Sequence, residues 1–197
     1  GNKFLSHIRE VDAIIHMIRC FDSADIQNVN PTVDPIRDLE IIETEMMLAD
    51  IESIQKRLGK NNKKNLDEEQ LKILEIALDC INNNKDISTL KNNFDKKLLN
   101  LSGLLFLKPK IFVCNVDEQS LQGGNDYTKA FINKFGKENS LIVSADIENQ
   151  INQLDVSEKK NYMEMIGLKE TGLDMLIQKG YNILELDTYF TSGPEET

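Results

Sequence analysis

Two short polar segments follow apolar runs that have the length of β-strands. Asn-Val-Asp-Glu at 115–118 comes directly after the apolar residues 111–114, and Ser144 and Ala145 come after 140–143. An asparagine side chain donates and accepts hydrogen bonds, a carboxylate accepts from ring or exocyclic N–H groups, and small residues let a ligand approach the backbone amides. The two segments are therefore suited to clamp a purine base, while helix capping and turn formation would explain the same residue types.

These segments need a parallel sheet to position them, because ligands of open α/β sheets bind beyond the carboxyl ends of the strands. A helix is expected between them, from Asn125 to Phe135, with Gly136 closing it. If the two strands are neighbours, their polar segments face one another. The mostly apolar run 12–21 predicts another strand, buried on both faces. The alternation predicts an α/β fold with a parallel sheet and flanking helices.

Two long segments in the middle of the chain have the spacing of a coiled-coil seam. The first helix is expected to begin at Asp34-Pro35, with Asp as N-cap, and to end at Gly59; the second opens with the acids at 67–69. A short polar turn joins them, which predicts an antiparallel helical hairpin inserted into the α/β domain. The two seams are Met47, Ile51, Ile54 and Leu58, and Leu71, Leu74, Leu78 and Ile81.

Other segments carry weaker signals. A helical face is expected at Asn2–Glu10, and another helix within 87–106 that leads back to the α/β part. After Ser144 and Ala145, a helix is expected from Ile147. Two more helices are expected at 157–165 and 173–179, and the tail 184–193 is typical of a strand that begins a new unit.

The composition is that of an acidic globular chain. The net charge of −10 argues against non-specific nucleic-acid binding as the main role. Residues 50–100 hold 9 acids and 10 bases, so this part could approach a polyanion, although a solvated mixed-charge helix surface is the simpler interpretation. Cys20, Cys80 and Cys114 have no metal-binding or disulfide spacing, which indicates reduced core residues in a cytoplasmic protein. No apolar run approaches the length of a membrane span, so no membrane partner is expected.

The amino-acid sequence of the two polar segments is similar to a known pair of motifs. Asn-Lys-x-Asp after one strand and Ser-Ala after the next form the guanine-reading pair of translation-factor-type GTPases; here Val116 stands at the Lys position and Glu118 at the Asp position. This departure resembles the YchF/Obg-like ATPase family, which carries Asn-x-x-Glu there and prefers ATP. Further segments agree in the family's order: GNKFLSHIREVDAIIHMIRCF, NPTVDPIRDLEIIETEMMLADIESIQKR, LKPKIFVCNVDE, SADIE and LDTYFTSG.

The resemblance implies a role for each residue of the two segments. Asn115 would hydrogen-bond the base edge, Val116 would pack on the ring, and Ser144 and Ala145 would close the other side. Glu118 is one methylene longer than Asp and would misalign with the two donors of guanine, N1–H and N2–H₂. ATP is therefore the expected nucleotide, in preference to GTP.

The resemblance also implies a domain order, in which this chain is the central fragment of a longer protein. An Obg-type nucleotide-binding domain would comprise 1–45 and 107–187, a helical coiled-coil insertion 46–106, and the start of a TGS domain 188–197. The chain contains no G-x-x-x-x-G-K-[ST] and no Asp-x-x-Gly, the motifs that hold the phosphates and Mg²⁺. No catalytic and no metal-binding residue is therefore assigned, and Mg²⁺ is expected only with a P-loop upstream of Gly1.

Three functions are compatible with these features. In the first, the complete protein hydrolyses ATP and associates with ribosomes or translation through the coiled coil, while this chain alone is inactive. In the second, the helical hairpin is an interaction module that docks a protein partner or RNA, and the nucleotide segments are vestigial. In the third, the protein binds GTP with relaxed specificity. A P-loop upstream of Gly1 would favour the first function over the second.

Overall fold

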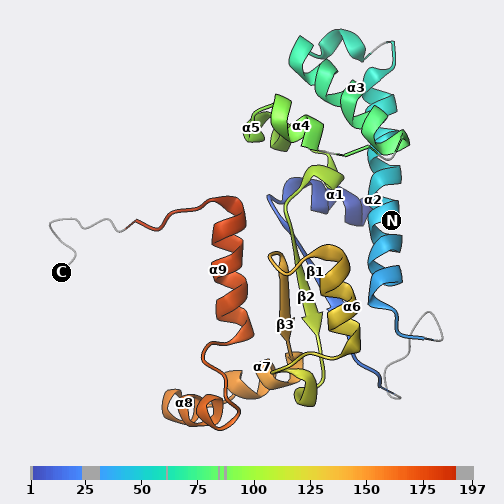
Figure 1. Cartoon of the computed structure of the whole chain (residues 1–197). Coiled ribbons are helices and arrows are strands. Elements are labelled where there is room, and N and C mark those ends of the chain that lie inside the picture. Colours follow the sequence, from blue (N-terminus) through green and yellow to red (C-terminus); the bar gives the residue numbers. More distant parts are fainter. Residues whose placement is uncertain (1, 24–31, 61, 84, 87, 190–197) are drawn as a thin grey trace, which may run out of the picture. The chain divides into compact units, whose positions relative to one another are not determined.

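A computed structural model gives the arrangement of most of the chain. The residues that it describes are 2–23, 32–60, 62–83, 85–86 and 88–189. The chain divides into two compact units, residues 1–18 with 34–110 and residues 19–33 with 111–197. Its three-stranded parallel sheet has the order β1-β2-β3 (Figure 1), made of Ile14–Arg19, Lys110–Asn115 and Ser140–Val143. The prediction of an α/β fold with flanking helices is confirmed.

The second unit contains the strands whose ends carry the polar segments. β2 and β3 are parallel, and their register runs from Phe112 opposite Ser140 to Asn115 opposite Val143. This pairing brings the carboxyl ends of the two strands to the same edge of the sheet. The described residues of this unit also form the 3₁₀ turn η3 (Glu118–Ser120) and the helices α6 (Asp126–Phe135), α7 (Ala145–Asn152), α8 (Val156–Met165) and α9 (Gly172–Leu184).

Both faces of β2 are covered, which explains its unbroken run of buried residues. On one face Phe112 packs against Phe131 and Phe135 of α6, with ring centroids 5.6 and 5.7 Å apart. On the other face Ile111 and Val113 pack with Val143, together with Leu141, Leu176 and Ile183. The continuous hydrophobicity at 111–114 therefore reflects a strand buried between two helices, as parallel sheets require.

Helix α6, which connects β2 to β3, has the boundaries that its sequence predicted. Asn125 caps it by accepting from Thr128 N at 3.0 Å, and the Thr128 hydroxyl accepts from Asn125 N at 2.8 Å. Gly136 ends the helix with φ of 91°, a conformation that glycine adopts without a steric penalty. These two ends fix the length of the connection between the two strands.

The first unit is mainly helical. Asp34 caps α2 through Arg37 N at 3.0 Å, and Asp67 caps α3 through Gln70 N at 2.7 Å, so both predicted helix starts are confirmed. Gly59 ends α2, also as predicted. The elements are α1 (Asn2–Glu10), β1, α2 (Pro35–Leu58), η1 (Lys63–Asn65), α3 (Glu68–Asn82), α4 (Ser88–Asn93), α5 (Lys96–Leu101) and η2 (Leu105–Leu107).

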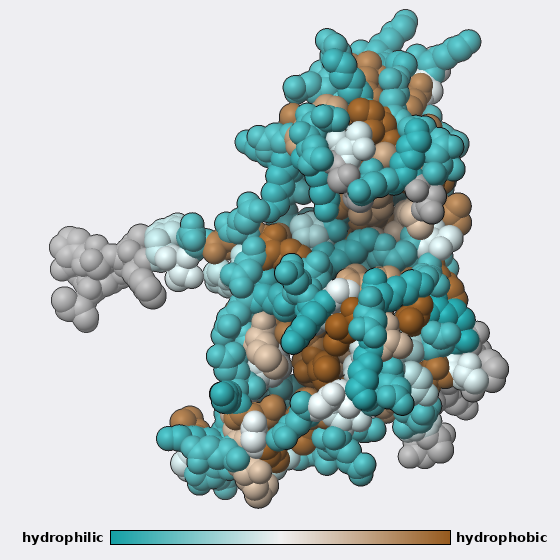
Figure 2. Space-filling model, viewed as in Figure 1, coloured by the Kyte–Doolittle hydropathy of each residue, from teal (hydrophilic) through white to brown (hydrophobic). Residues whose placement is uncertain are grey.

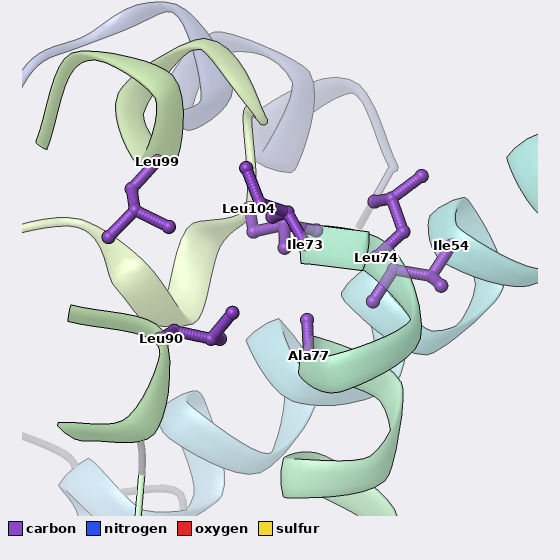
Figure 3. Packing of buried hydrophobic residues seen from close by; sticks show 7 residues of the cluster. All are labelled: Ile54, Ile73, Leu74, Ala77, Leu90, Leu99 and Leu104. Atoms are coloured by element: carbon purple, nitrogen blue, oxygen red, sulfur yellow. The ribbon is translucent and has the colours of Figure 1, made fainter. Parts of the chain in front are cut away.

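Helices α2 and α3 form the predicted hairpin and share a hydrophobic cluster with the segments that follow (Figure 3). Leu74 of α3 and Ile54 of α2 are fully buried, and Leu90 of α4 and Leu99 of α5 belong to the same cluster. The outer surface of this hairpin is covered mainly by hydrophilic residues (Figure 2). The hairpin therefore has its own core and does not depend on one continuous seam.

The seam predicted on α2 is partly wrong. Met46, rather than Met47, is buried, and the buried position in the middle of the helix is Asp50 rather than Ile51. Met46 packs with Ile14 and Leu105. The buried residues Met46, Asp50 and Ile54 follow one another at intervals of four, so they form one stripe on the helix, and the first two predicted seam positions are displaced from it by one residue.

Four other predicted elements differ in detail. The segment 87–106 forms two short helices, because Asp95 interrupts the pattern and caps α5 through Lys97 N at 2.9 Å. Helix α7 begins at Ala145, two residues earlier than expected, and α9 extends to Leu184. Residues 185–189 form no strand, and the rest of the predicted tail strand lies outside the described residues.

The expected domain borders stay a prediction. The two units do not follow these borders, because residues 1–18 and 34–110 group together. The proposed TGS start at 188–197 lies outside the described residues except for its first two positions. Among the helices of the described residues, none combines the length and the apolar character needed to cross a membrane.

Candidate functional site

The two predicted polar segments are joined by direct hydrogen bonds at the ends of β2 and β3. Asn115 Oδ1 accepts from Ala145 N at 2.9 Å, and Val116 N donates to Val143 O at 2.9 Å. The parallel register makes this contact possible, because Asn115 is the last residue of β2 and lies opposite Val143. The two segments are therefore in direct contact and are not two separate turns.

The side chain of Asn115 is held in a defined orientation. Its oxygen is used by Ala145 N, so its Nδ2 group points away from that contact. Among the described residues, none accepts a hydrogen bond from Asn115 Nδ2. A fixed amide with an unused donor can read an acceptor on the edge of a base, and pre-organisation lowers the entropy cost of binding.

A second contact fixes the backbone of Asn115 from the other side. Cys20 N donates to Asn115 O at 2.8 Å, and Asn125 Nδ2 donates to Cys20 O at 2.7 Å. Asn125 is also the cap of α6, so the start of this helix and the end of β2 are joined through Cys20. The sequence indicated Asn125 as a cap, but it gave no signal for its contact with Cys20.

Two cysteines lie next to Asn115: Cys114 precedes it in β2, and Cys20 is bonded to its carbonyl group. Both side chains are fully buried, and both are free cysteines. The contact with the Cys114 thiol and the burial of the side chain raise the pKa of Cys20, which keeps this thiol protonated. The prediction that these cysteines are reduced core residues agrees with their burial.

The two neighbouring carboxylates after β2 have different tasks. Asp117 caps the turn η3 by accepting from Ser120 N at 2.9 Å. Glu118 instead accepts from Gln150 Nε2 of α7 at 2.8 Å, and both of these residues are exposed. Turn formation therefore accounts for the contact of Asp117 but not for that of Glu118, whose carboxylate is bonded to α7.

The remaining predicted site residues differ in their accessibility. Ala145 is exposed, whereas Val116 is only 2% exposed, which leaves a small part of its side chain for contact with a base. Ser144 is 1% exposed, and its Oγ has no hydrogen-bond partner among the described residues. Of the two residues of this segment, only Ala145 is therefore accessible to a ligand.

Helix α7, which carries Ala145, is itself held by α9. Glu148 accepts from Gly172 N at 2.6 Å and from Leu173 N at 3.3 Å, so its carboxylate caps the start of α9. Gly172 is required there, because a Cβ atom would lie 2.7 Å from Val143 Cγ1. The second polar segment is therefore fixed to β3 and to α9 as well as to Asn115.

Two residues that connect the parts of the candidate site, Gln150 and Tyr162, were not predicted from the sequence. Gln150 contacts Glu118, and its Oε1 accepts from the hydroxyl of Tyr162 in α8 at 2.5 Å. These pairs lie 32 and 12 residues apart in the chain. No local pattern signals such contacts, because they depend on how α7 and α8 pack.

Known proteins resemble the whole of this chain. No family model matches it. The ribosome-binding ATPase YchF of Bacillus subtilis is 37% identical and that of Haemophilus influenzae 36% identical, each over 206 residues that cover 100% of this chain and 56% of the relative. The solved structure of the YchF GTPase of Schizosaccharomyces pombe matches with a TM-score of 0.77 and 30% identity, over 98% of this chain and 55% of that one.

These similarities confirm the resemblance to the YchF/Obg-like ATPase family that the sequence motifs indicated. The chain spans a little over half the length of these relatives. The relatives are described as ATPases in two cases and as a GTPase in the third. Their names therefore establish nucleotide chemistry in the relatives, and they leave the choice of base open.

Proposed function

This chain is homologous over its full length to YchF proteins, and we propose that it supplies the base-reading part of an ATP-binding site. The complete protein would hydrolyse ATP and associate with ribosomes, as the names of the bacterial relatives say of those proteins. The observation that carries the proposal is the bond between Ala145 N and Asn115 Oδ1, which orients an unused amide donor. A ribosome-associated role supports a cytoplasmic location.

The preference for ATP over GTP rests on Glu118. Guanine presents two adjacent donors, N1–H and N2–H₂, and an aspartate at this position would pair with both. Glu118 is longer and already accepts from Gln150, so it is poorly placed for that two-point contact. Adenine has an acceptor at N1 and lacks the N2 amine, so its binding depends less on this carboxylate.

Replacement of the two departures from the guanine-reading motif tests this preference. In the complete protein, the double change Val116→Lys and Glu118→Asp should raise the affinity for GTP relative to ATP by roughly ten-fold, because one charge-assisted hydrogen bond is gained. The measurement is competition titration with both nucleotides. Asp126→Glu, an exposed change of acid length on α6, is the matched control. Unchanged relative affinities would show that this loop does not select the base.

Hydrolysis is proposed only for the complete protein. The phosphates and Mg²⁺ need a glycine-rich loop with its Lys and Ser or Thr, and this chain contains no such motif. Phosphate release from ATP should therefore be measurable for the complete protein and absent for residues 1–197 alone. Equal turnover by the two would contradict this division of the site.

The helical hairpin is the proposed contact with the ribosome. Its tip carries Lys60, Lys63 and Lys64, and Lys63 is engaged with Glu75 at 3.0 Å. Lys60→Glu with Lys64→Glu should therefore weaken co-sedimentation with ribosomes, since phosphate contacts depend on positive charge. Lys129→Glu with Lys137→Glu, in the other unit, reverses the same number of charges as a control. Equal binding by both double variants would remove the tip from the interface.

A second candidate function is a GTP-binding protein of relaxed specificity, which the name of the fission yeast relative favours. Equal affinities for ATP and GTP in the wild-type protein would support it. An interaction module with vestigial nucleotide segments is the third candidate. Ribosome binding without any nucleotide binding by the complete protein would support that one.

A further inference from the structure

A chain of three side chains runs from the base-reading loop into α8. Gln150 Nε2 donates to Glu118 Oε1 at 2.8 Å, and the Tyr162 hydroxyl donates to Gln150 Oε1 at 2.5 Å. Glu118 and Gln150 are exposed, and Tyr162 is half-buried. The chain therefore lies on the surface where a ligand could reach Glu118.

The orientation of the Gln150 amide follows from its two partners. An ionised carboxylate only accepts hydrogen bonds, so the NH₂ group of Gln150 must face Glu118. The oxygen of the amide then faces Tyr162, whose hydroxyl can donate to it. Each partner suits one end of the amide, and the pair therefore discourages the flipped orientation.

The position of Gln150 is tied to the same helix that forms the site. It lies on α7, whose first residue Ala145 is bonded to Asn115 and whose residues Ile147 and Ile151 are buried. Gln150 therefore keeps a fixed relation to the base-reading loop. Any nucleotide that pairs with Glu118 must do so in the presence of this donor.

We propose that Gln150 is a specificity-determining residue that acts through Glu118, and that Tyr162 positions it. Gln150 occupies one of the two carboxylate oxygens, while Oε2 has no partner among the described residues. Guanine pairs best with a carboxylate whose two oxygens both face its N1–H and N2–H₂ donors, whereas the donor from Gln150 uses a lone pair of Oε1 and holds the carboxylate turned toward α7. The inference rests on the proposed function and assigns part of the bias against guanine to residues outside the motif.

The test is the ratio of ATP to GTP affinity in the complete protein, measured by competition against a fluorescent nucleotide. Gln150→Leu keeps the size of the side chain but removes the donor, and it should shift the ratio toward GTP by roughly five-fold, as expected for one hydrogen bond to a charged group. Tyr162→Phe should shift it in the same direction by about two-fold. Gln153→Leu, on the exposed end of the same helix, should leave it unchanged.

A double-mutant cycle separates this role from a merely structural one. If Gln150 acts through Glu118, then Gln150→Leu should not alter the ratio in a protein that already carries Glu118→Ala. An unchanged ratio for Gln150→Leu alone, or the same shift in both backgrounds, would overturn the inference. If the wild-type protein prefers ATP in an Asn115-dependent way, such a result leaves the proposed function intact. Absence of nucleotide binding by the wild type would overturn both.

Discussion

The helical unit and the proposed base-reading loop at 115–118 use similar polar groups in opposite ways. In the helical unit, Asp50 is fully buried, and both of its oxygens are used: Oδ1 accepts from Arg9 Nη1 at 2.8 Å and Oδ2 from Phe106 N at 3.0 Å. In the loop, Asn115 and Glu118 each keep one polar atom without a partner among the described residues. A buried polar group needs its partners within the protein, whereas an accessible group with an unused polar atom is available to a ligand.

Arg9 extends this contrast, because three of its five N–H donors are used by groups of the same unit. Besides Asp50, it donates to Ala49 O at 3.1 Å and to Gly103 O at 2.7 Å. The open cavity beside it, of about 250 Å³, is lined by Arg9, Ser6, Ser53 and Lys56 among others. This arginine therefore holds α1, α2 and the segment before η2 together.

Removal of the buried carboxylate should have the largest effect on stability. Asp50→Ala leaves the Arg9 guanidinium and Phe106 N without their partner, and it should lower the free energy of unfolding by about 3–5 kcal/mol. Urea unfolding measures this loss. Asp79→Ala removes an exposed acid of the same unit that pairs with Lys85, and it should lower the free energy of unfolding far less, because solvent screens this pair. Similar losses for the two variants would contradict the distinction between buried and exposed carboxylates.

The next effect concerns the packing of α9 against β3, next to the proposed base-reading site. Gly172→Ala would place a methyl group 2.7 Å from Val143 Cγ1 and should cost about 1–3 kcal/mol by overpacking. Gly180→Ala, on the same helix, has no atom within 4 Å of the new Cβ and should stabilise the helix by about 0.5–1 kcal/mol. Thermal unfolding of the two variants should show shifts of opposite sign. Shifts of the same sign would remove Gly172 from the packing argument.

A smaller effect should appear as a pH dependence in the helical unit. Burial alone would raise the pKa of Glu43, but the contacts with His16 and Lys110 outweigh burial and lower the pKa below its ordinary value of 4.5. The stabilisation is therefore fully present above pH 4.5 and is lost as pH falls through the lowered folded value. The stability difference between wild type and Glu43→Gln should shrink below pH 4.5.

The matched control for this pH dependence is Glu45→Gln, an exposed position on the same helix. The free energy of unfolding of Glu45→Gln should differ from that of the wild type by a constant amount as the pH is lowered. The difference between Glu43→Gln and the wild type should instead shrink. Unfolding free energies measured between pH 3 and pH 7 distinguish the two. A constant difference for Glu43→Gln across this range would show that its contacts do not favour the ionised form.

Elements with strong local signals were predictable from the sequence. Asp34 and Asp67 cap their helices, and β3 spans Ser140–Val143, as the patterns indicated. The inward face of the first half of α2 was not predictable, because Met46 and Met47 are both apolar and the contacts with Ile14 and Leu105 decide which of them is buried. Local propensity specifies where an element lies, and tertiary packing specifies which of its faces is buried.

The candidate site shows the same division. Asn115 and Ala145 could be placed together, because parallel neighbours bring their carboxyl ends to one edge of the sheet. Gln150 could not be assigned, since its contact with Glu118 depends on the packing of α7 beside η3. The sequence also could not separate Asp117 from Glu118 by type. Only the hydrogen bond from Ser120 N identifies Asp117 as the turn-forming carboxylate.

The most direct test of the account is the affinity of the complete protein for ATP when Asn115 is replaced. Asn115→Ala removes the proposed donor to the base and the acceptor that holds Ala145 N. Isothermal titration should show roughly ten-fold or greater weakening of ATP binding, since two hydrogen bonds are lost. Asn149→Ala, an exposed change on α7, should bind ATP as the wild type does. Unchanged ATP affinity of Asn115→Ala would contradict the assignment of this loop as the base reader.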